Sequence, residues 1–322
     1  MLAALFPRPL PGIVTHAQPK EAVYLRELLT GAQAQIGKFD PALPGPENRM
    51  APVAEGWLQL GVPALDRCAK MDSEWVLLDE IGYLECGCAE YTNAVRSLMA
   101  KKRVAAVVRA QDLPFLNELR AREDAFVVDL DDPFGSCGCV IMASGLGKRF
   151  GGNKLMADFH GQPMIARVLD ATEGIFERRV VVTRHEDVAA LCKDRGIECT
   201  LHDLPLRSDT VRLGLEAIGD VQRCMFCAGD QPLLRWETIA VIALTAANMP
   251  EQIWRAAFAG EPGSPVLFPA WAYPQLRALP EGKGGGYVCK RYPERVGLIP
   301  VQNALELTDA DDPETLCMLL EQ

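Results

Sequence analysis

Short apolar runs alternate with stretches of helical spacing along two parts of the chain. In the first part, β-branched runs predict strands, namely EWVLLDE (74–80), RVAAVVRA (103–110) and AFVVDL (125–130). Helical spacing predicts helices at 91–102 and 113–123. In the second part, the predicted strands are CVIMA (139–143), RVVVT (179–183), CMFCAGD (224–230) and SPVLF (264–268). The helices predicted between and after these strands span 164–176, 186–196, 208–219 and 236–248.

This alternation is typical of α/β proteins, in which helices cover both faces of a parallel sheet. Acidic residues, proline, glycine and serine cluster in DLDDPFGSCG, residues 129–138, and indicate a break between two domains. We therefore expect two α/β domains, at 1–132 and 137–322, each a mainly parallel sheet flanked by helices. Ligands bind such sheets at the carboxyl ends of the strands, where the loop after CVIMA lies.

That loop, ASGLGKRFGGNK (143–154), combines four glycines with three cations. Glycines let backbone N–H groups approach a phosphate, and Arg149 and Lys154 supply positive charge where a triphosphate is most negative. A solvated surface turn is the alternative interpretation. The spacing is not that of a Walker A loop, G-x-x-x-x-G-K-[ST], and Phe150 breaks the dinucleotide pattern G-x-G-x-x-G.

The loop resembles LAAGxSxRMGxxK, the signature of nucleotidyltransferases related to molybdenum cofactor cytidylyltransferase and guanylyltransferase. The matching positions are Ala143, Gly145, Arg149, Gly151 and Lys154. Gly147 and Phe150 replace the family's serine and methionine. Four further motifs of that family follow in order, FHGQPMIARVL (159–169), CAGDQPLL (227–234), EPGSPVLF (261–268) and DADDPETL (309–316). The resemblance covers about 137–320 and implies a Rossmann-like nucleotidyltransferase domain.

The resemblance also implies site residues. The nucleotide would be contacted by Ala143, Ser144, Gly145, Gly147, Lys148, Gly151 and Ser208, and the catalytic residues would be Arg149, Lys154 and Asp230. Asp230 follows the strand CMFCAG, so its carboxylate can hold Mg²⁺ against substrate phosphates, and a helix cap is the alternative. Asp309 and Asp311 are weaker candidates, with a simple turn as the alternative for the pair, and Asp311 is the one that we expect as a second metal ligand. Ser208 would cap a helix or approach a ligand.

By this resemblance, the protein would transfer a nucleotidyl group from an NTP to molybdopterin cofactor. A phosphate oxygen of the acceptor would attack the α-phosphate, and pyrophosphate would leave. Catalysis would consist of positioning and of charge neutralisation by Mg²⁺, lysine and arginine. The sequence Ala143-Ser144-Gly145 is closer to the cytidylyl family's A-A-G than to the guanylyl family's A-G-G, which favours CTP. PEGKGGGYV (280–288) replaces the G-D-x-G that the family often has near the acceptor.

The partners implied are the NTP, molybdopterin cofactor, and a molybdenum hydroxylase or another cofactor-maturation protein. Two alternatives stay open. The first is a sugar-phosphate nucleotidyltransferase. The second is of another class, a non-catalytic nucleotide-sensing protein or cofactor carrier.

In the first domain, EWVLLDEIGYLE (74–85) places Asp79 and Glu80 at a strand end, as in a Walker B motif. Over roughly 5–130 the sequence resembles the nucleoside-triphosphatase/kinase family first described from thermophiles, which carries D-E-I-G-x-M-E. That family opens with a strand and a G-x-x-x-x-G-K-[ST] loop, which are missing from the sequence given. We therefore expect a degenerate P-loop NTPase-like domain that neither binds nor hydrolyses NTP appreciably, and whose sheet has an open edge or gap.

Composition narrows the choice of partners. The chain has 33 Lys+Arg against 43 Asp+Glu, a net charge of -10, which argues against general affinity for nucleic acid or anionic membranes. No apolar stretch approaches the roughly 18 to 20 residues of a membrane span. MLAALFPRPLPG (1–12) makes a poor signal peptide, and we expect a cytoplasmic protein. Eleven cysteines fit a reducing compartment. Cys224 and Cys227 are predicted to lie in a buried strand and not in a metal or redox site.

Overall fold

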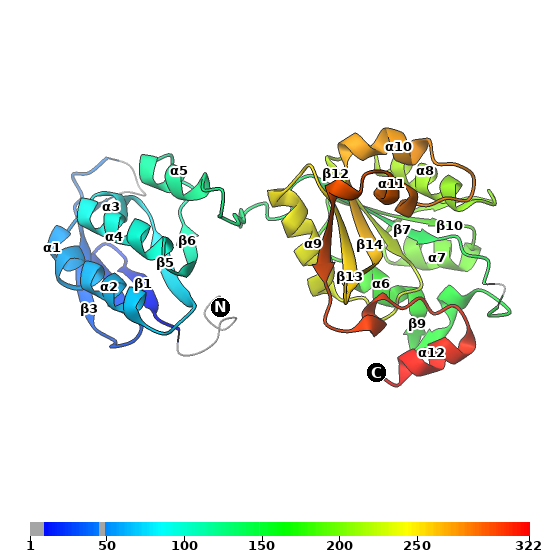
Figure 1. Cartoon of the computed structure of the whole chain (residues 1–322), viewed down its shortest axis with the longest axis horizontal. Coiled ribbons are helices and arrows are strands. Elements are labelled where there is room, and N and C mark those ends of the chain that lie inside the picture. Colours follow the sequence, from blue (N-terminus) through cyan, green and yellow to red (C-terminus); the bar gives the residue numbers. More distant parts are fainter. Residues whose placement is uncertain (1–9, 45–48, 148) are drawn as a thin grey trace. The chain divides into compact units, whose positions relative to one another are not determined.

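The computed structural model describes residues 10–44, 49–147 and 149–322 (Figure 1). The chain divides into two compact units, Met1–Ala125 and Phe126–Gln322. Among the described residues, no helix has the length and apolar character needed to cross a membrane. The α/β class predicted from the sequence is confirmed, because sheets flanked by helices make up both units.

The first unit is built on a six-stranded sheet with the order β4-β3-β2-β1-β5-β6. Its strands are β1 (Gly12–Gln18), β2 (Ala22–Glu27), β3 (Gln33–Phe39), β4 (Met50–Pro52), β5 (Trp75–Ile81) and β6 (Arg103–Val108). β5 pairs in parallel with β1 and β6, whereas β1 to β4 pair antiparallel. This sheet is therefore mixed and not mainly parallel. Short connections such as 19–21 permit only antiparallel hairpins, since a parallel crossover needs about a dozen residues or more.

Helices of the first unit pack on the side of the sheet that carries its core. They are α1 (Ala54–Gly56), η2 (Trp57–Gly61), α2 (Val62–Lys70), α3 (Tyr83–Cys86), α4 (Ala89–Met99) and α5 (Pro114–Arg120). Ile13 and Leu78 from the sheet join Leu65 of α2 and Val95 of α4 in one buried cluster. Successive strand residues point to opposite faces, and Val14 on the other face is only half-buried.

The strand predicted at 125–130 is wrong. The structure assigns no strand there, and Phe126 and Leu130 are 54% and 75% exposed. The N–H of Val127 donates to the side-chain oxygen of Asn248 at 2.7 Å and not to a strand. A β-branched run needs a neighbouring strand to complete its hydrogen bonds, and this segment has none among the described residues.

The second unit contains a seven-stranded sheet with the order β11-β10-β7-β12-β14-β13-β15. Its strands are β7 (Cys137–Ala143), β10 (Arg178–Thr183), β11 (Glu198–Leu201), β12 (Arg223–Ala228), β13 (Ile253–Phe258), β14 (Glu261–Pro269) and β15 (Val296–Pro300). β11, β10, β7 and β12 are parallel, β14 runs antiparallel to its two neighbours, and β13 pairs in parallel with β15. A separate hairpin joins β8 (Asp158–Phe159) to β9 (Gln162–Pro163).

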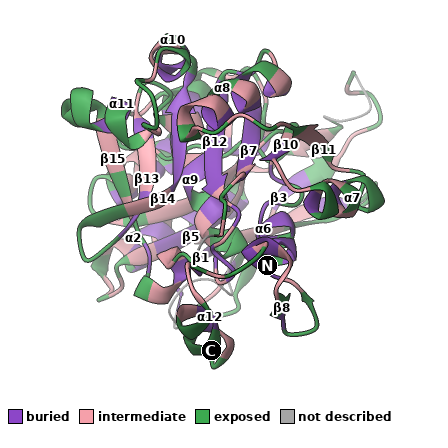
Figure 2. Cartoon of the chain, turned by 90° about the vertical axis from the view of Figure 1, so that its right-hand side faces the viewer, coloured by how far each residue is buried: buried purple, intermediate pink, exposed green. Residues whose placement is uncertain are grey.

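Helices cover both faces of this second sheet, and the strands between them are buried (Figure 2). One face packs against α6 (Met164–Ala171), α7 (Glu186–Asp194), α9 (Trp236–Asn248) and α12 (Pro313–Leu320). The other packs against α8 (Arg207–Ile218), α10 (Tyr273–Arg277) and α11 (Gly286–Arg291). Cys227 belongs to the first face and Cys224 to the second, so the two thiols cannot form one site.

Candidate functional site

Two parallel strands end side by side at the centre of the second sheet. The N–H of Gly229, just after β12, donates to the carbonyl of Met142 near the end of β7 at 3.0 Å. The glycine-rich loop leaves β7 at this edge, and Asp230 leaves β12 beside it. The register of the sheet therefore brings together two motifs that lie far apart in the sequence.

The conformation of the loop explains why glycine replaces the family's serine at position 147. Gly147 has a φ of 56°, and a Cβ there would lie 2.2 Å from the carbonyl oxygen of Gly152. A side chain at 147 would therefore force the loop apart. Gly145, Gly151 and Gly152 face open space, which leaves their backbone accessible. Lys148, a predicted nucleotide contact, lies outside the described residues.

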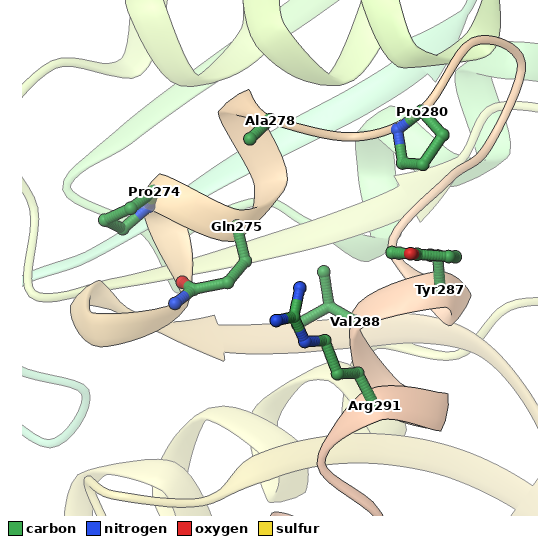
Figure 3. Close-up of a pocket in the computed structure, with 7 residues that line it drawn as sticks. All are labelled: Pro274, Gln275, Ala278, Pro280, Tyr287, Val288 and Arg291. Carbon is green, nitrogen blue, oxygen red and sulfur yellow. The ribbon is translucent and has the colours of Figure 1, made fainter.

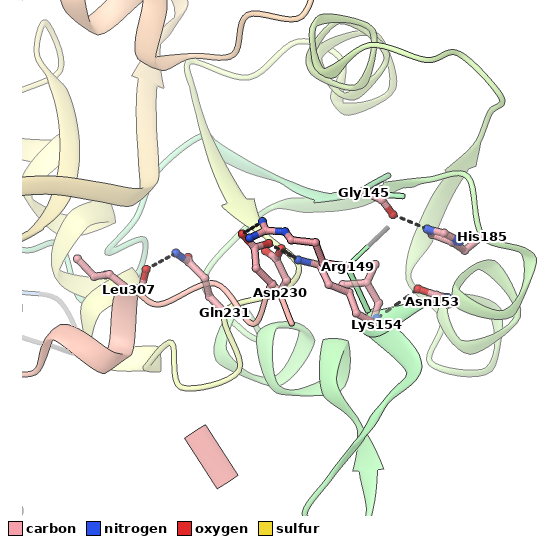
Figure 4. Close-up of polar contacts among 10 residues, drawn as sticks. Gly145, Arg149, Asn153, Lys154, His185, Asp230, Gln231 and Leu307 are labelled. Carbon is pink, nitrogen blue, oxygen red and sulfur yellow. Dashed lines mark hydrogen bonds and ion pairs between the residues drawn. The ribbon is translucent and has the colours of Figure 1, made fainter. Parts of the chain in front are cut away.

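Lys154 is the centre of an ionic cluster (Figure 4). Its side chain is only 7% exposed, and Nζ lies 2.5 Å from Asp230 Oδ2 and 2.8 Å from Asp311 Oδ1. Arg149 Nη2 contacts the other oxygen of Asp311 at 2.6 Å. Burial acts to lower the pKa of Lys154, but the two carboxylates outweigh it and raise the pKa above its usual value. The structure thus brings together the four charged residues that were predicted for the site, Arg149, Lys154, Asp230 and Asp311.

A further carboxylate joins this cluster. Burial, with the nearby Asp230 and Asp311 carboxylates, raises the pKa of Asp309 to about 6. The hydrogen bond from Lys154 lowers the pKa of Asp311. The described residues contain no group of three or more His, Cys, Asp or Glu side chains arranged to hold a metal ion. The Asp230 and Asp311 carboxylates fit Mg²⁺ only if phosphate oxygens complete its coordination, which is the usual way that magnesium binds.

Two histidines that the sequence did not single out line the loop. Ser144 Oγ donates to the carbonyl of Val182 at 3.0 Å, so its contact with His202 Nε2 at 2.7 Å requires the imidazole to donate. His185 Nε2 lies 2.9 Å from the carbonyl oxygen of Gly145. Burial and Arg184 lower the pKa of His202, which favours the neutral ring. His185 follows β10, the neighbour of β7, and His202 follows β11, one strand further out. This position after parallel strands of the same sheet is the one signal that could have identified them.

The capping role expected for Ser208 is wrong. Helix α8 begins at Arg207 with Leu206 as its N-cap residue, and the Asp209 carboxylate accepts from the N–H of Leu206 at 3.2 Å. Ser208 Oγ instead accepts from the N–H of Gly282 at 3.3 Å. The hydroxyl therefore attaches the loop before α11 to α8.

A cavity of about 440 Å³ adjoins Asp230, because Ala228 and Gln231 on either side of it line the wall. Its charged and polar lining residues include Arg207, Arg255, Lys283, Lys290, Gln231 and Asp309. Two of the three consecutive glycines at 284–286 shape the wall of this cavity. A Cβ on Gly284 would lie 2.9 Å from Arg207 Nε, and one on Gly285 would lie 2.7 Å from the ring of Phe268.

A smaller hollow of about 210 Å³ lies between α10 and α11, where Pro274, Tyr287 and Arg291 line it (Figure 3). It contains none of the predicted site residues.

In the first unit, Asp79 and Glu80 lie at the end of β5. Glu80 forms an ion pair with Arg109, and its N–H donates to Thr15 Oγ1 at 3.2 Å. Glu85, which the family motif shares, is buried and accepts from the N–H of Gly82 at 2.7 Å. Burial raises the pKa of Glu85 to about 7. Glu80 is thus bound to an arginine, and Glu85 holds the turn after the strand.

Comparison with known families identifies both units. Residues 139–296 match the model of the MobA-like NTP transferase domain. The chain carries a MobA-like NTP transferase domain. Residues 28–133 match the NTPase model. The fusion inferred from the two sequence resemblances is confirmed.

Similarity to individual proteins is partial. A 3-deoxy-manno-octulosonate cytidylyltransferase of Neisseria meningitidis is 35% identical over 92 residues, 27% of this chain and 36% of the relative. The chain thus spans about a third of the length of the curated relatives it matches. Rv0371c of Mycobacterium tuberculosis superposes with a TM-score of 0.52 and 18% identity, over 59% of this chain and 100% of that one. A nucleotidyl transferase from Methanothermobacter superposes with a TM-score of 0.50 and 19% identity, over 58% of this chain and 96% of that one. These structures share the fold of the second unit.

Proposed function

We propose that residues 137–322 form a Mg²⁺-dependent nucleotidyltransferase. The observation that carries the proposal is the Lys154–Asp230–Asp311 cluster beside an open glycine-rich loop. An oxygen of the acceptor forms a bond to the α-phosphorus of the NTP, the bond from that phosphorus to the bridging oxygen breaks, and pyrophosphate leaves. Similarity to the MobA-like domain supports this reaction class.

Each charged residue has a role in this reaction. Asp230, with Asp311, would hold Mg²⁺, which supplies charge neutralisation at the phosphates. Lys154 and Arg149 exchange their carboxylate partners for phosphate oxygens and stabilise the charge that develops on the leaving pyrophosphate. The loop backbone positions the triphosphate through its accessible amides.

CTP is the donor that we propose. Ser144 places a side chain where the guanylyl family has glycine, and this side chain is fixed by Val182 and His202. The matched relatives named as cytidylyltransferases support the same choice. Molybdopterin cofactor is the proposed acceptor, on the resemblance of the loop motifs. The name of those relatives supports a second candidate acceptor, the sugar acid 3-deoxy-manno-octulosonate.

The test is to incubate the full chain with Mg²⁺, each NTP in turn, and either molybdopterin cofactor or 3-deoxy-manno-octulosonate. Pyrophosphate release and the product mass are measured. We expect release with CTP and molybdopterin cofactor and a product that carries CMP. No pyrophosphate release with any donor and either acceptor would refute the proposed reaction. Release with 3-deoxy-manno-octulosonate alone would refute molybdopterin cofactor as the acceptor and support the sugar acid.

A further inference from the structure

The cavity beside Asp230 holds positive charge that the protein leaves uncompensated. Among the described residues, Arg207, Arg255, Lys283 and Lys290 form no ion pair with a carboxylate, although Asp309 also lines the wall. Arg212, which lies on helix α8 as Arg207 does, in contrast forms an ion pair with Asp209 at 3.0 Å. A cluster of unpaired cations in a chain of net charge -10 attracts a small anion.

The oxygen of a buried side-chain amide in the same wall lacks a hydrogen-bond partner among the described residues. Gln231 is 2% exposed, and its Nε2 donates to the carbonyl of Leu307 at 2.9 Å (Figure 4). The side chain also hydrogen-bonds the Asp309 carboxylate. These two acceptors fix the orientation of the amide, because a flipped amide would turn its oxygen towards them. Gln231 Oε1 then has no hydrogen-bond partner among the described residues, and the same is true of Ser264 Oγ, also in the wall.

Unsatisfied buried acceptors in a native protein call for an explanation, and a ligand that donates a hydrogen bond supplies one. A ligand that satisfies the wall of the cavity therefore needs two groups, an anionic group to pair with the cations and an O–H or N–H group to donate to Gln231. Gln231 directly follows Asp230, where the nucleotide and metal are proposed to meet. One of the cations, Lys283, lies on the segment PEGKGGGYV that departs from the family pattern.

On the basis of the proposed function, we infer that this cavity selects the acceptor as a small anion that presents an O–H or N–H donor to Gln231. Arg207, with Lys283 and Lys290, binds the anionic group. Two sources share this chemistry, a phosphate ester of a ring compound and a sugar acid with a carboxylate. Both carry an anion and hydrogen-bond donors, and the experiment separates them.

The experiment measures binding to the full chain loaded with Mg²⁺ and a non-hydrolysable CTP analogue. The probes are 7,8-dihydroneopterin phosphate and 3-deoxy-manno-octulosonate, titrated by calorimetry. The variants are Arg207→Ala and Gln231→Met, with Arg212→Ala and Gln222→Met as matched controls outside the cavity. Circular dichroism verifies that each variant is folded, and a separate titration measures the affinity for the CTP analogue.

We expect one probe to bind the wild type and thereby to identify the anion. Arg207→Ala weakens that probe by about tenfold to a hundredfold, the scale of a lost charge-assisted hydrogen bond. Gln231→Met weakens it by about fivefold or more. The controls, and the affinity for the CTP analogue in every variant, stay within about twofold, on the scale of surface substitutions.

Failure of the CTP analogue to bind the wild type would refute the proposed function. With the analogue bound, two results would overturn the inference alone. One is that neither probe binds, and the other is that a probe binds Arg207→Ala or Gln231→Met as tightly as the wild type.

Discussion

Replacing Lys154 by methionine tests the centre of the candidate site. The change keeps most of the side-chain volume and removes the ammonium that lies 2.5 Å from Asp230 and 2.8 Å from Asp311. In the proposed reaction this ammonium binds phosphate oxygens most strongly when pyrophosphate leaves. Removal of one preorganised charged donor costs about 3 kcal/mol of transition-state stabilisation, or about a hundredfold in rate.

The effect on stability should be smaller than the effect on rate. Breaking a fully buried ion pair costs about 3 to 5 kcal/mol. Here Asp230 is 20% and Asp311 43% exposed, so water solvates both carboxylates once the lysine is gone. Arg149 also remains on Asp311. We therefore expect a loss of about 1 to 2 kcal/mol in the free energy of unfolding, of the size measured for a typical single substitution.

The assay is pyrophosphate release at saturating CTP and acceptor, together with urea unfolding of the same preparation. Lys193→Met, at an exposed position of helix α7 that takes no part in the ion pairs of the cluster, is the control and should change neither quantity. Asp230→Asn should reproduce the hundredfold loss through the metal. Near-normal turnover of a folded Lys154→Met protein would show that the cluster is not the catalytic centre.

Four further predictions address other parts of the chain. Ser144→Gly should raise the use of GTP relative to CTP in a competition assay, and an unchanged ratio would remove Ser144 from base selection. Gly147→Ala should weaken NTP binding by calorimetry at least about tenfold, because the φ of 56° and the 2.2 Å approach to Gly152 exclude a side chain. Glu80→Gln should leave the phosphate release from ATP by the full chain at background, and release that depends on this residue would establish an active NTPase. Burial raises the pKa of Glu85 to about 7 from 4.5, so its contribution to stability is full below pH 4.5 and is lost as the pH rises to 7. Glu85→Gln should remove that loss, so that between pH 4 and pH 8 its free energy of unfolding rises by about 3 kcal/mol relative to that of the wild type, as measured by urea unfolding. The same pH dependence in both proteins would contradict the assignment.

The sequence predicted four strands of the second unit, β7, β10, β12 and β14, because each is a strong local pattern, whereas β11, β13 and β15 were not predicted. A buried parallel strand such as β7 is a continuous apolar run, and the loop motif and Asp230 directly follow two such runs. The parallel register then places the two strand ends at one edge. In the first unit, β2 and β3 are strands of 6 and 7 residues that mix polar and apolar positions, and their signal is too weak to identify them.

The remainder of the site depends on contacts that no local pattern encodes. Asp311 reaches Lys154 from 157 positions away, and helix α8, strand β13 and the loop before α11 each contribute cations to one cavity. In the segment 125–130, in contrast, the sequence predicts an element that the structure does not form. Its composition predicts a strand, but composition does not provide the neighbouring strand that completes one. Propensity is thus informative when tertiary structure supplies the partner.

The ion pairs of the cluster also bear on how a nucleotide would enter. Without ligand, the ammonium of Lys154 pairs with both Asp230 and Asp311, so a free triphosphate must compete with two carboxylates for this cation. A triphosphate that arrives with Mg²⁺ removes this competition, because the metal takes the carboxylates while the phosphates take the ammonium and Arg149. Every charge then keeps a partner throughout the exchange, which avoids the cost of leaving a buried charge unpaired. If residues 137–322 bind NTP as proposed, Mg²⁺ is required for nucleotide affinity and not only for turnover.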